Sequence, residues 1–95
     1  MNQYIFNDDD ILEVQQIRKC ELAFFYQRCP YAFRKELECL FVTSYKKKFY
    51  TSNEVRKIFS HLGEVTRADV LNAQSRIEEY YKKLKRRYKL KVLKK

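Results

Sequence analysis

Glycine and proline are almost absent from this chain, which has one of each in 95 residues, Gly63 and Pro30. β-Sandwiches and barrels turn roughly every 8 to 12 residues and need such residues at the turns, so the composition argues against them. No apolar run approaches the roughly 18 residues of a membrane span, and the opening MNQYIFNDDD does not have the pattern of a signal peptide. We therefore expect a helical, intracellular protein, either cytoplasmic or nuclear.

Residues that catalyse reactions or hold metals are also scarce. His61 is the single histidine, and the chain has no glycine-rich phosphate loop and no serine or cysteine with an evident base partner. Cys20, Cys29 and Cys39 form no C-x-x-C pair. We expect each to be a small buried apolar side chain rather than a zinc ligand together with His61. The sequence predicts no enzyme and no cofactor.

Aromatic and basic residues, in contrast, are abundant. The chain has 15 Phe and Tyr and a formal net charge of +9. Residues 1–45 hold five Lys or Arg against seven Asp or Glu, whereas residues 46–95 hold 16 against five. A positive half of this kind favours a polyanion or an acidic protein as the partner. The length allows one hydrophobic core, so we expect residues 1–95 to form a single domain.

Apolar residues at spacings of three and four predict four helices, at roughly 8–27, 30–47, 52–62 and 66–90. Asn7 or Asp8 is expected to cap the first helix. Pro30 suits the first turn of the second helix, because the proline N has no hydrogen to leave unpaired there. The predicted fold class is all-α, a compact bundle of about four helices without a sheet.

Two capping boxes mark the starts of the last two predicted helices. Thr51 with Glu54, and Thr66 with Asp69, place a hydroxyl and a carboxylate three residues apart, so that each can accept from the backbone N–H of the other residue. Gly63 stands where a left-handed residue ends a helix. These signals predict a helix at 52–62, a short turn, and a helix that begins at 66.

The last predicted helix separates apolar from basic residues. A rotation of about 100° per residue gathers Val70, Ala73, Ile77, Tyr80, Tyr81, Leu84, Tyr88 and Val92 on one arc, which we expect to face the core. Truncating Leu84 or Tyr88 should therefore cost about 2–5 kcal/mol. The other arc is basic, and like charges four residues apart repel, so helix stability does not explain it. After Tyr88 the segment KLKVLKK also fits a frayed helix end or a strand with alternating apolar residues.

The helices at 52–62 and 66–90 are loosely similar to a helix-turn-helix, in which the start of the second helix reads base edges. An ordinary helical hairpin is the alternative. The segment YKKKFY adds three lysines, either as phosphate contacts beside stacking rings or as a polar link whose rings turn inward.

These patterns predict a small, non-catalytic nucleic-acid-binding protein, a transcription regulator or accessory factor that binds duplex DNA in preference to RNA. The residues expected to contact nucleic acid are Lys46, Lys47, Lys48, Lys82, Lys83, Lys85, Arg86, Arg87 and Lys89, with Arg67, Asn72, Ser75 and Arg76 as candidates for base edges. The alternative is a helical interaction subunit or inhibitor that docks an acidic protein. A third possibility is binding of the basic helix to anionic lipid. The aromatic content also suggests a homodimer.

Overall fold

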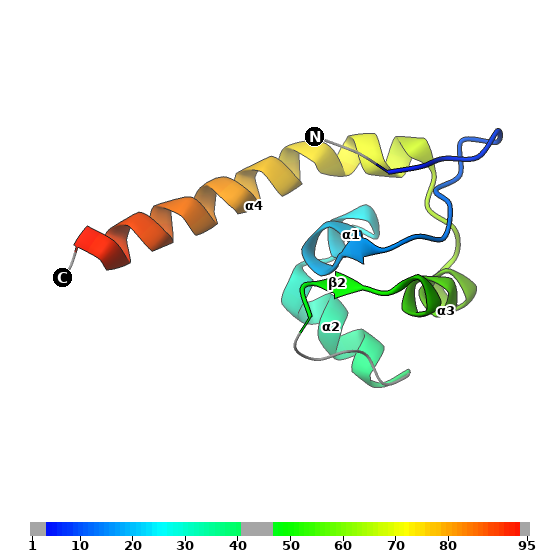
Figure 1. The fold of residues 1–95 in the computed structure, drawn as a ribbon, viewed down its shortest axis with the longest axis horizontal. Coiled ribbons are helices and arrows are strands. Elements are labelled where there is room, and N and C mark those ends of the chain that lie inside the picture. Colours follow the sequence, from blue (N-terminus) through cyan, green and yellow to red (C-terminus); the bar gives the residue numbers. More distant parts are fainter. Residues whose placement is uncertain (1–3, 41–46, 94–95) are drawn as a thin grey trace.

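The protein is mainly helical, with one small antiparallel sheet (Figure 1). The computed structural model describes residues 4–40 and 47–93, and side chains as far as Arg86. The elements are β1 (Ile17–Arg18), α1 (Lys19–Phe25), α2 (Pro30–Glu38), β2 (Phe49–Tyr50), α3 (Ser52–Leu62) and α4 (Arg67–Leu93). Strand β1 pairs with β2 in the register Ile17↔Tyr50 and Arg18↔Phe49. The prediction of four helices is confirmed, but the prediction that the fold has no sheet is wrong.

The predicted helix at 8–27 is the largest error, because most of it is a turn and an extended segment. The Asn7 Oδ1 atom accepts hydrogen bonds from the backbone N–H groups of Asp9 and Ile11, at 2.9 and 3.0 Å. Asp10 has a φ of 60°. Asparagine and aspartate side chains compete with helical hydrogen bonds and tolerate this left-handed region. Asn7 therefore closes a tight turn instead of capping a helix, and α1 begins only at Lys19.

The segment after this turn lies along the connection between α3 and α4. The backbone N of Leu12 donates to the carbonyl of Val65 at 2.7 Å, and the backbone N of Arg67 donates to the carbonyl of Asp10 at 2.8 Å. Leu12 is only 2% exposed. The apolar spacing that suggested a helix therefore comes from a segment whose partners lie more than 50 residues away in the sequence.

Helix α2 begins at Pro30, as predicted, but is shorter than predicted. The Cys29 Sγ atom accepts from the backbone N of Ala32 at 3.4 Å and caps the helix. The helix ends at Glu38, and Lys47 is not helical. Residues 41–46 lie outside the described ranges. Cys29 and Cys39 flank this helix and are exposed, so the expectation that every cysteine is buried is wrong for these two.

Both predicted capping boxes are present. The Thr51 N and the Glu54 carboxylate are 2.8 Å apart, and the Glu54 N and the Thr51 hydroxyl are 3.3 Å apart. At the start of α4, the corresponding distances between Thr66 and Asp69 are 3.0 and 3.2 Å. Gly63 follows the last residue of α3 with a φ of 95°, a conformation that residues with a side chain rarely adopt. These local signals placed α3 at its observed bounds and the start of α4 within one residue.

One buried cluster receives residues from all six elements. Its members are Leu12, Ile17, Leu22, Ala23, Phe25, Phe33, Leu37, Tyr50, Val55, Ile58, Phe59, Val65, Val70, Ala73 and Ile77. Within the described ranges, α4 packs chiefly against α1, while α3 packs chiefly against β2. Helices α3 and α4 are therefore not the closely packed pair of a helix-turn-helix.

Helix α4 is longer than the core that it packs on. Its 27 residues span about 40 Å, and the longest dimension of the molecule is 48 Å. Ile77 is 1% exposed, Tyr81 is half-buried and Leu84 is 42% exposed. Figure 1 shows the second half of α4 extending beyond the rest of the molecule. We call residues 82–93 the α4 extension. The expectation that Leu84 fills a core site is wrong, and the side chains of Tyr88 and Val92 lie outside the described residues.

Two truncations on α4 should separate its anchored half from the extension. Ile77→Ala should lower the free energy of unfolding by about 2–5 kcal/mol, because it empties a closed core site. Leu84→Ala should lower it by less than about 1 kcal/mol, because the side chain is already in contact with solvent. Urea denaturation of both variants measures the difference. Equal losses would contradict the position of the core boundary.

Candidate functional site

The basic residues predicted at the end of the chain lie on the α4 extension. Lys82, Lys83, Lys85 and Arg86 are exposed, and none of them forms an ion pair within 4.0 Å with another described residue. Residues 80–95 contain no Asp or Glu. The backbone of Arg87 and Lys89 is helical, but their side chains lie outside the described residues. The extension therefore carries a high density of positive charge in direct contact with solvent.

The candidates for base edges lie on the other half of α4, which is anchored to the core. The Arg67 Nε atom is 3.0 Å from the Asp10 carboxylate, and its guanidinium lies 4.3 Å from the centre of the Phe6 ring. Arg67 thus ties the start of α4 to the amino-terminal segment. Asn72, Ser75 and Arg76 are exposed.

Two acidic residues interrupt the surface of α4 between these candidates and the extension. Glu78 and Glu79 are both exposed in the turn that precedes Lys82. A phosphate backbone that follows the extension would meet like charge at this turn. The two halves of α4 therefore do not form one continuous basic surface.

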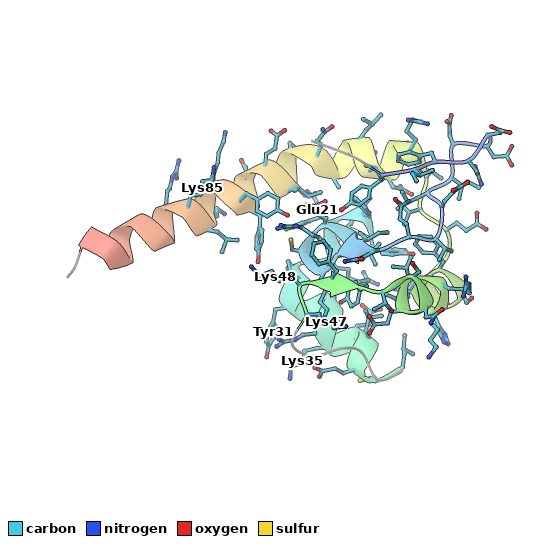
Figure 2. All side chains as sticks on the ribbon, in the orientation of Figure 1. Glu21, Tyr31, Lys35, Lys47, Lys48 and Lys85 are labelled. Atoms are coloured by element: carbon cyan, nitrogen blue, oxygen red, sulfur yellow. The ribbon has the colours of Figure 1, made fainter. Side chains whose placement is uncertain are left out.

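A second basic surface is formed by residues that come from five elements and the segment before β2. It is a cleft of about 500 Å³. Its lining residues are Arg18, Lys19, Cys20, Pro30, Tyr31, Arg34, Lys47, Lys48, Tyr50, Tyr80, Tyr81 and Leu84. Five of these residues are cationic and none is acidic. In Figure 2, Lys47, Lys48 and Tyr31 lie below α4 and to the right of Lys85, which is labelled on the α4 extension. We call this surface the basic cleft.

Aromatic rings contact Arg18 and Lys19 in the basic cleft. The Arg18 guanidinium lies 5.5 Å from the centre of the Phe49 ring and 5.8 Å from that of Tyr81. The Lys19 ammonium lies 5.3 Å from the ring of Tyr50. Contacts of this kind attract a cation through the face of the ring and do not neutralise its charge, as a carboxylate would. These ring contacts of Arg18 and Lys19 therefore do not reduce the positive charge of the cleft.

Two cations in the cleft, Arg34 and Lys19, are partly buried. The Arg34 Nε atom is buried and donates no hydrogen bond among the described residues, and the Glu38 carboxylate lies 3.9 Å away. Burial lowers the pKa of Lys19, because desolvation disfavours the ammonium ion. An anion bound in the cleft would stabilise the positively charged forms of both side chains.

A buried carboxylate next to a residue of the cleft, Tyr81, holds α1 and α4 together. Glu21 is 8% exposed. Its two oxygens accept hydrogen bonds from the Tyr4 hydroxyl at 2.5 Å and the Tyr81 hydroxyl at 2.6 Å. The Cys20 Sγ atom lies 3.4 Å from the same Tyr81 hydroxyl. Glu21 therefore fixes the orientation of Tyr81, whose ring lines the cleft.

The lysine segment before β2 is only partly described, since Lys46 lies outside the described residues. Lys47 and Lys48 are exposed at the cleft, whereas Phe49 is half-buried and Tyr50 is 1% exposed. The prediction that the rings of this segment turn inward is confirmed for Tyr50. Burial raises the pKa of Tyr50 to about 12, so its hydroxyl stays protonated at neutral pH.

Sequence reasoning missed Arg18, Lys19, Arg34 and Tyr31 as parts of one site. The stretches IRK and PYAFRK do alternate basic with apolar or aromatic residues. This signal is weak, because the pairing of β1 with β2 brings IRK to the lysine segment and the packing of α2 brings PYAFRK to the same cleft. The basic cleft is a product of the tertiary structure.

The aromatic residues give little support to the predicted homodimer. Among the Phe and Tyr residues whose burial is described, Tyr31 alone is exposed, at 65%. The others lie in the core or are half-buried. The folded chain therefore conceals most of the aromatic surface that motivated the prediction, and self-association stays a prediction.

Comparisons of the chain with protein-family models, curated protein sequences and solved structures found no match in any of the three. Among the described residues, no helix has the length and apolar character needed to cross a membrane. The same part of the chain contains no group of three or more His, Cys, Asp or Glu side chains placed to hold a metal ion. The chemistry of the two basic surfaces is therefore the available guide to function.

The hydrogen bonds to Glu21 should make folding sensitive to alkaline pH. Burial, followed by the hydrogen bond to Glu21, raises the pKa of Tyr4 above its ordinary value. As the pH rises, the unfolded chain loses this proton first, so the stability is fully present below about pH 10 and falls above it. Tyr4→Phe should therefore lose less stability than the wild type between about pH 8 and about pH 11.

Urea denaturation at the two pH values provides the measurement. Tyr31→Phe is the matched control, because Tyr31 is exposed, and it should lose as much stability as the wild type. If Tyr4→Phe and Tyr31→Phe behave alike, the Tyr4–Glu21 hydrogen bond does not contribute as described.

Proposed function

We propose that this protein binds nucleic acid without catalysis and that the α4 extension contacts the phosphate backbone of duplex DNA. The observation that carries the proposal is the α4 extension itself, a helix beyond the core with exposed cations and no carboxylate. A role as a regulator or accessory factor fits such a protein.

Folding does not account for the charges of the extension. Lys82 and Arg86 stand four residues apart, at a spacing where like charges repel, and the same holds for Lys83 with Arg87. An isolated helix shorter than about 12–15 residues is marginal in water. The extension has about this length and gains little from the core. A polyanion would remove the repulsion and stabilise the helix, which supports binding as the purpose of these charges.

The dimensions of the extension fit a duplex. Its 12 residues span about 18 Å, which corresponds to about five base pairs at a rise of about 3.4 Å. The major groove of B-form DNA, about 12 Å wide, admits an α-helix. The major groove of an RNA duplex is deep and narrow, and side chains cannot read it. These dimensions favour duplex DNA over duplex RNA as the ligand of the extension.

The candidates for base edges have different support. Asn72, Ser75 and Arg76 are exposed, but Glu78 and Glu79 separate them from the extension. Arg67 is already engaged by Asp10 and Phe6. We therefore assign the affinity to phosphate contacts, with weak dependence on base sequence.

The extension would also attract an acidic protein. Charge reversal on two different surfaces, together with competition by polyglutamate, distinguishes this alternative from DNA binding.

In the wild type, log affinity for a DNA duplex should fall with log salt at a slope of about −0.9 for each phosphate neutralised, or about −5 for five or six contacts. Lys82→Glu with Arg86→Glu should weaken binding at least about tenfold and reduce the magnitude of the slope by about 1.8. Fluorescence anisotropy at several salt concentrations measures both values.

The matched control is Arg56→Glu with Lys57→Glu on α3, which changes the formal charge by the same amount. Figure 1 shows α3 at the opposite end of the molecule from the extension. This pair should leave the slope unchanged. Equal losses from the two double variants would show that net charge alone attracts DNA. Stronger binding to polyglutamate than to DNA at equal charge would favour the acidic protein partner.

A further inference from the structure

The basic cleft differs from the α4 extension in shape, and this difference limits what it can hold. It is concave, and its volume of about 500 Å³ lies within the range of about 300–1,000 Å³ typical of small-ligand sites. The bases of a duplex are stacked inside the helix and cannot enter such a site. A ligand that fills the cleft must therefore be a small charged group or an unpaired part of a chain, and cannot be a double helix.

The chemistry of the lining suits an unpaired nucleotide. The lining has five cationic residues and no acidic one, so it provides contacts for phosphate, and the Glu38 carboxylate lies outside the lining at 3.9 Å from Arg34. Four tyrosines, at positions 31, 50, 80 and 81, line the same cleft. Proteins that bind single strands combine these two features, a positive groove for the backbone and aromatic rings on which bases stack.

Tyr31 is the ring best placed to receive a base. It is 65% exposed, whereas Tyr50 is buried and Tyr81 is fixed by Glu21. The Arg34 guanidinium and the Lys35 ammonium lie 5.4 and 5.7 Å from the centre of the Tyr31 ring. A base stacked on Tyr31 would therefore bring its own phosphate close to two cations, which share the Glu38 carboxylate at 3.9 Å.

The basic cleft and the α4 extension are continuous. Leu84 lines the cleft, and it lies on α4 between the exposed Lys83 and Lys85. A strand that leaves the cleft past Leu84 thus reaches the cations of the extension directly.

We propose that the basic cleft binds unpaired nucleotides, so that the protein recognises a DNA duplex with a single-stranded end: the duplex lies along the α4 extension and the unpaired strand enters the cleft. This inference rests on the proposed function, because it specifies which form of nucleic acid is bound. An acidic peptide would satisfy the cations equally well. It would lack the flat rings that match the tyrosines, so the nucleotide is the better occupant.

Three labelled probes test the proposal by fluorescence anisotropy. They are a blunt duplex, the same duplex with an overhang of about six nucleotides, and a blunt duplex lengthened by about three base pairs, which adds the same number of phosphates. The overhang probe should bind at least about fivefold more tightly than the lengthened duplex, which corresponds to about one stacked base.

Variants at the rim of the cleft test which residues cause the preference for the overhang probe. Tyr31→Ala should remove about fivefold or more of the preference, and Tyr31→Phe should keep it, because the ring remains. Lys47→Ala with Lys48→Ala should reduce the magnitude of the salt slope for the overhang probe by about 1.4 and leave the slope for the blunt duplex unchanged. These side chains are exposed, so folding should be preserved, and circular dichroism checks it.

The outcomes separate this inference from the proposed function. Equal affinity for the overhang and lengthened probes, with a slope for the blunt duplex near −5, would overturn the assignment of the cleft and leave the extension as a duplex-binding element. Failure to bind any probe would overturn both proposals. Polyglutamate and an unlabelled single strand are compared as competitors of the overhang probe. If polyglutamate displaces the probe as effectively as the single strand does, the occupant of the cleft is an acidic peptide and the assignment to a nucleotide is overturned.

Discussion

The hydrophobic core anchors only the first half of α4, and this limit determines the rest of the account. Val70, Ala73 and Ile77 are buried, and the apolar contact ends near Tyr81. Beyond that point the described side chains of α4, from Lys82 to Arg86, are exposed, so they must be suited to water or to a ligand. Their charge is of one sign only, which makes a polyanion the better match than solvent.

The same junction explains why the two basic surfaces lie next to each other. Glu21 on α1 accepts hydrogen bonds from Tyr4 and Tyr81 and thereby fixes the position at which α4 leaves the core. Breaking a buried interaction of this kind would leave a charged group without partners, which is costly. Tyr81 and Leu84 therefore lie at a defined place above the segment of Lys47 and Lys48, and they close one side of the basic cleft. A polar interaction in the core thus shapes a surface that we propose to be functional.

The sequence predicted the elements whose signals are local. The capping boxes at Thr51 and Thr66 and the glycine after α3 depend on residues three or four apart, and they located α3 and the start of α4. The amino-terminal segment was mispredicted because its conformation depends on distant partners, Val65 and Arg67, and on the turn at Asn7. The periodic stripe of α4 continues past Leu84 in the sequence, but a repeat cannot show where the opposing core ends. The basic cleft could not be predicted for a related reason, since it requires the pairing of β1 with β2.

The central claim is that the α4 extension and the basic cleft form one nucleic-acid interface. An NMR titration of the labelled protein with a DNA duplex that carries a single-stranded overhang tests this claim most directly. The account predicts that the backbone amide signals of Lys82, Lys83, Lys85 and Arg86 shift together with those of Lys47 and Lys48. Signals of α3 and of the turn at Asn7 should remain in place. Shifts confined to α3 or to the amino-terminal turn, with the extension unaffected, would contradict the account.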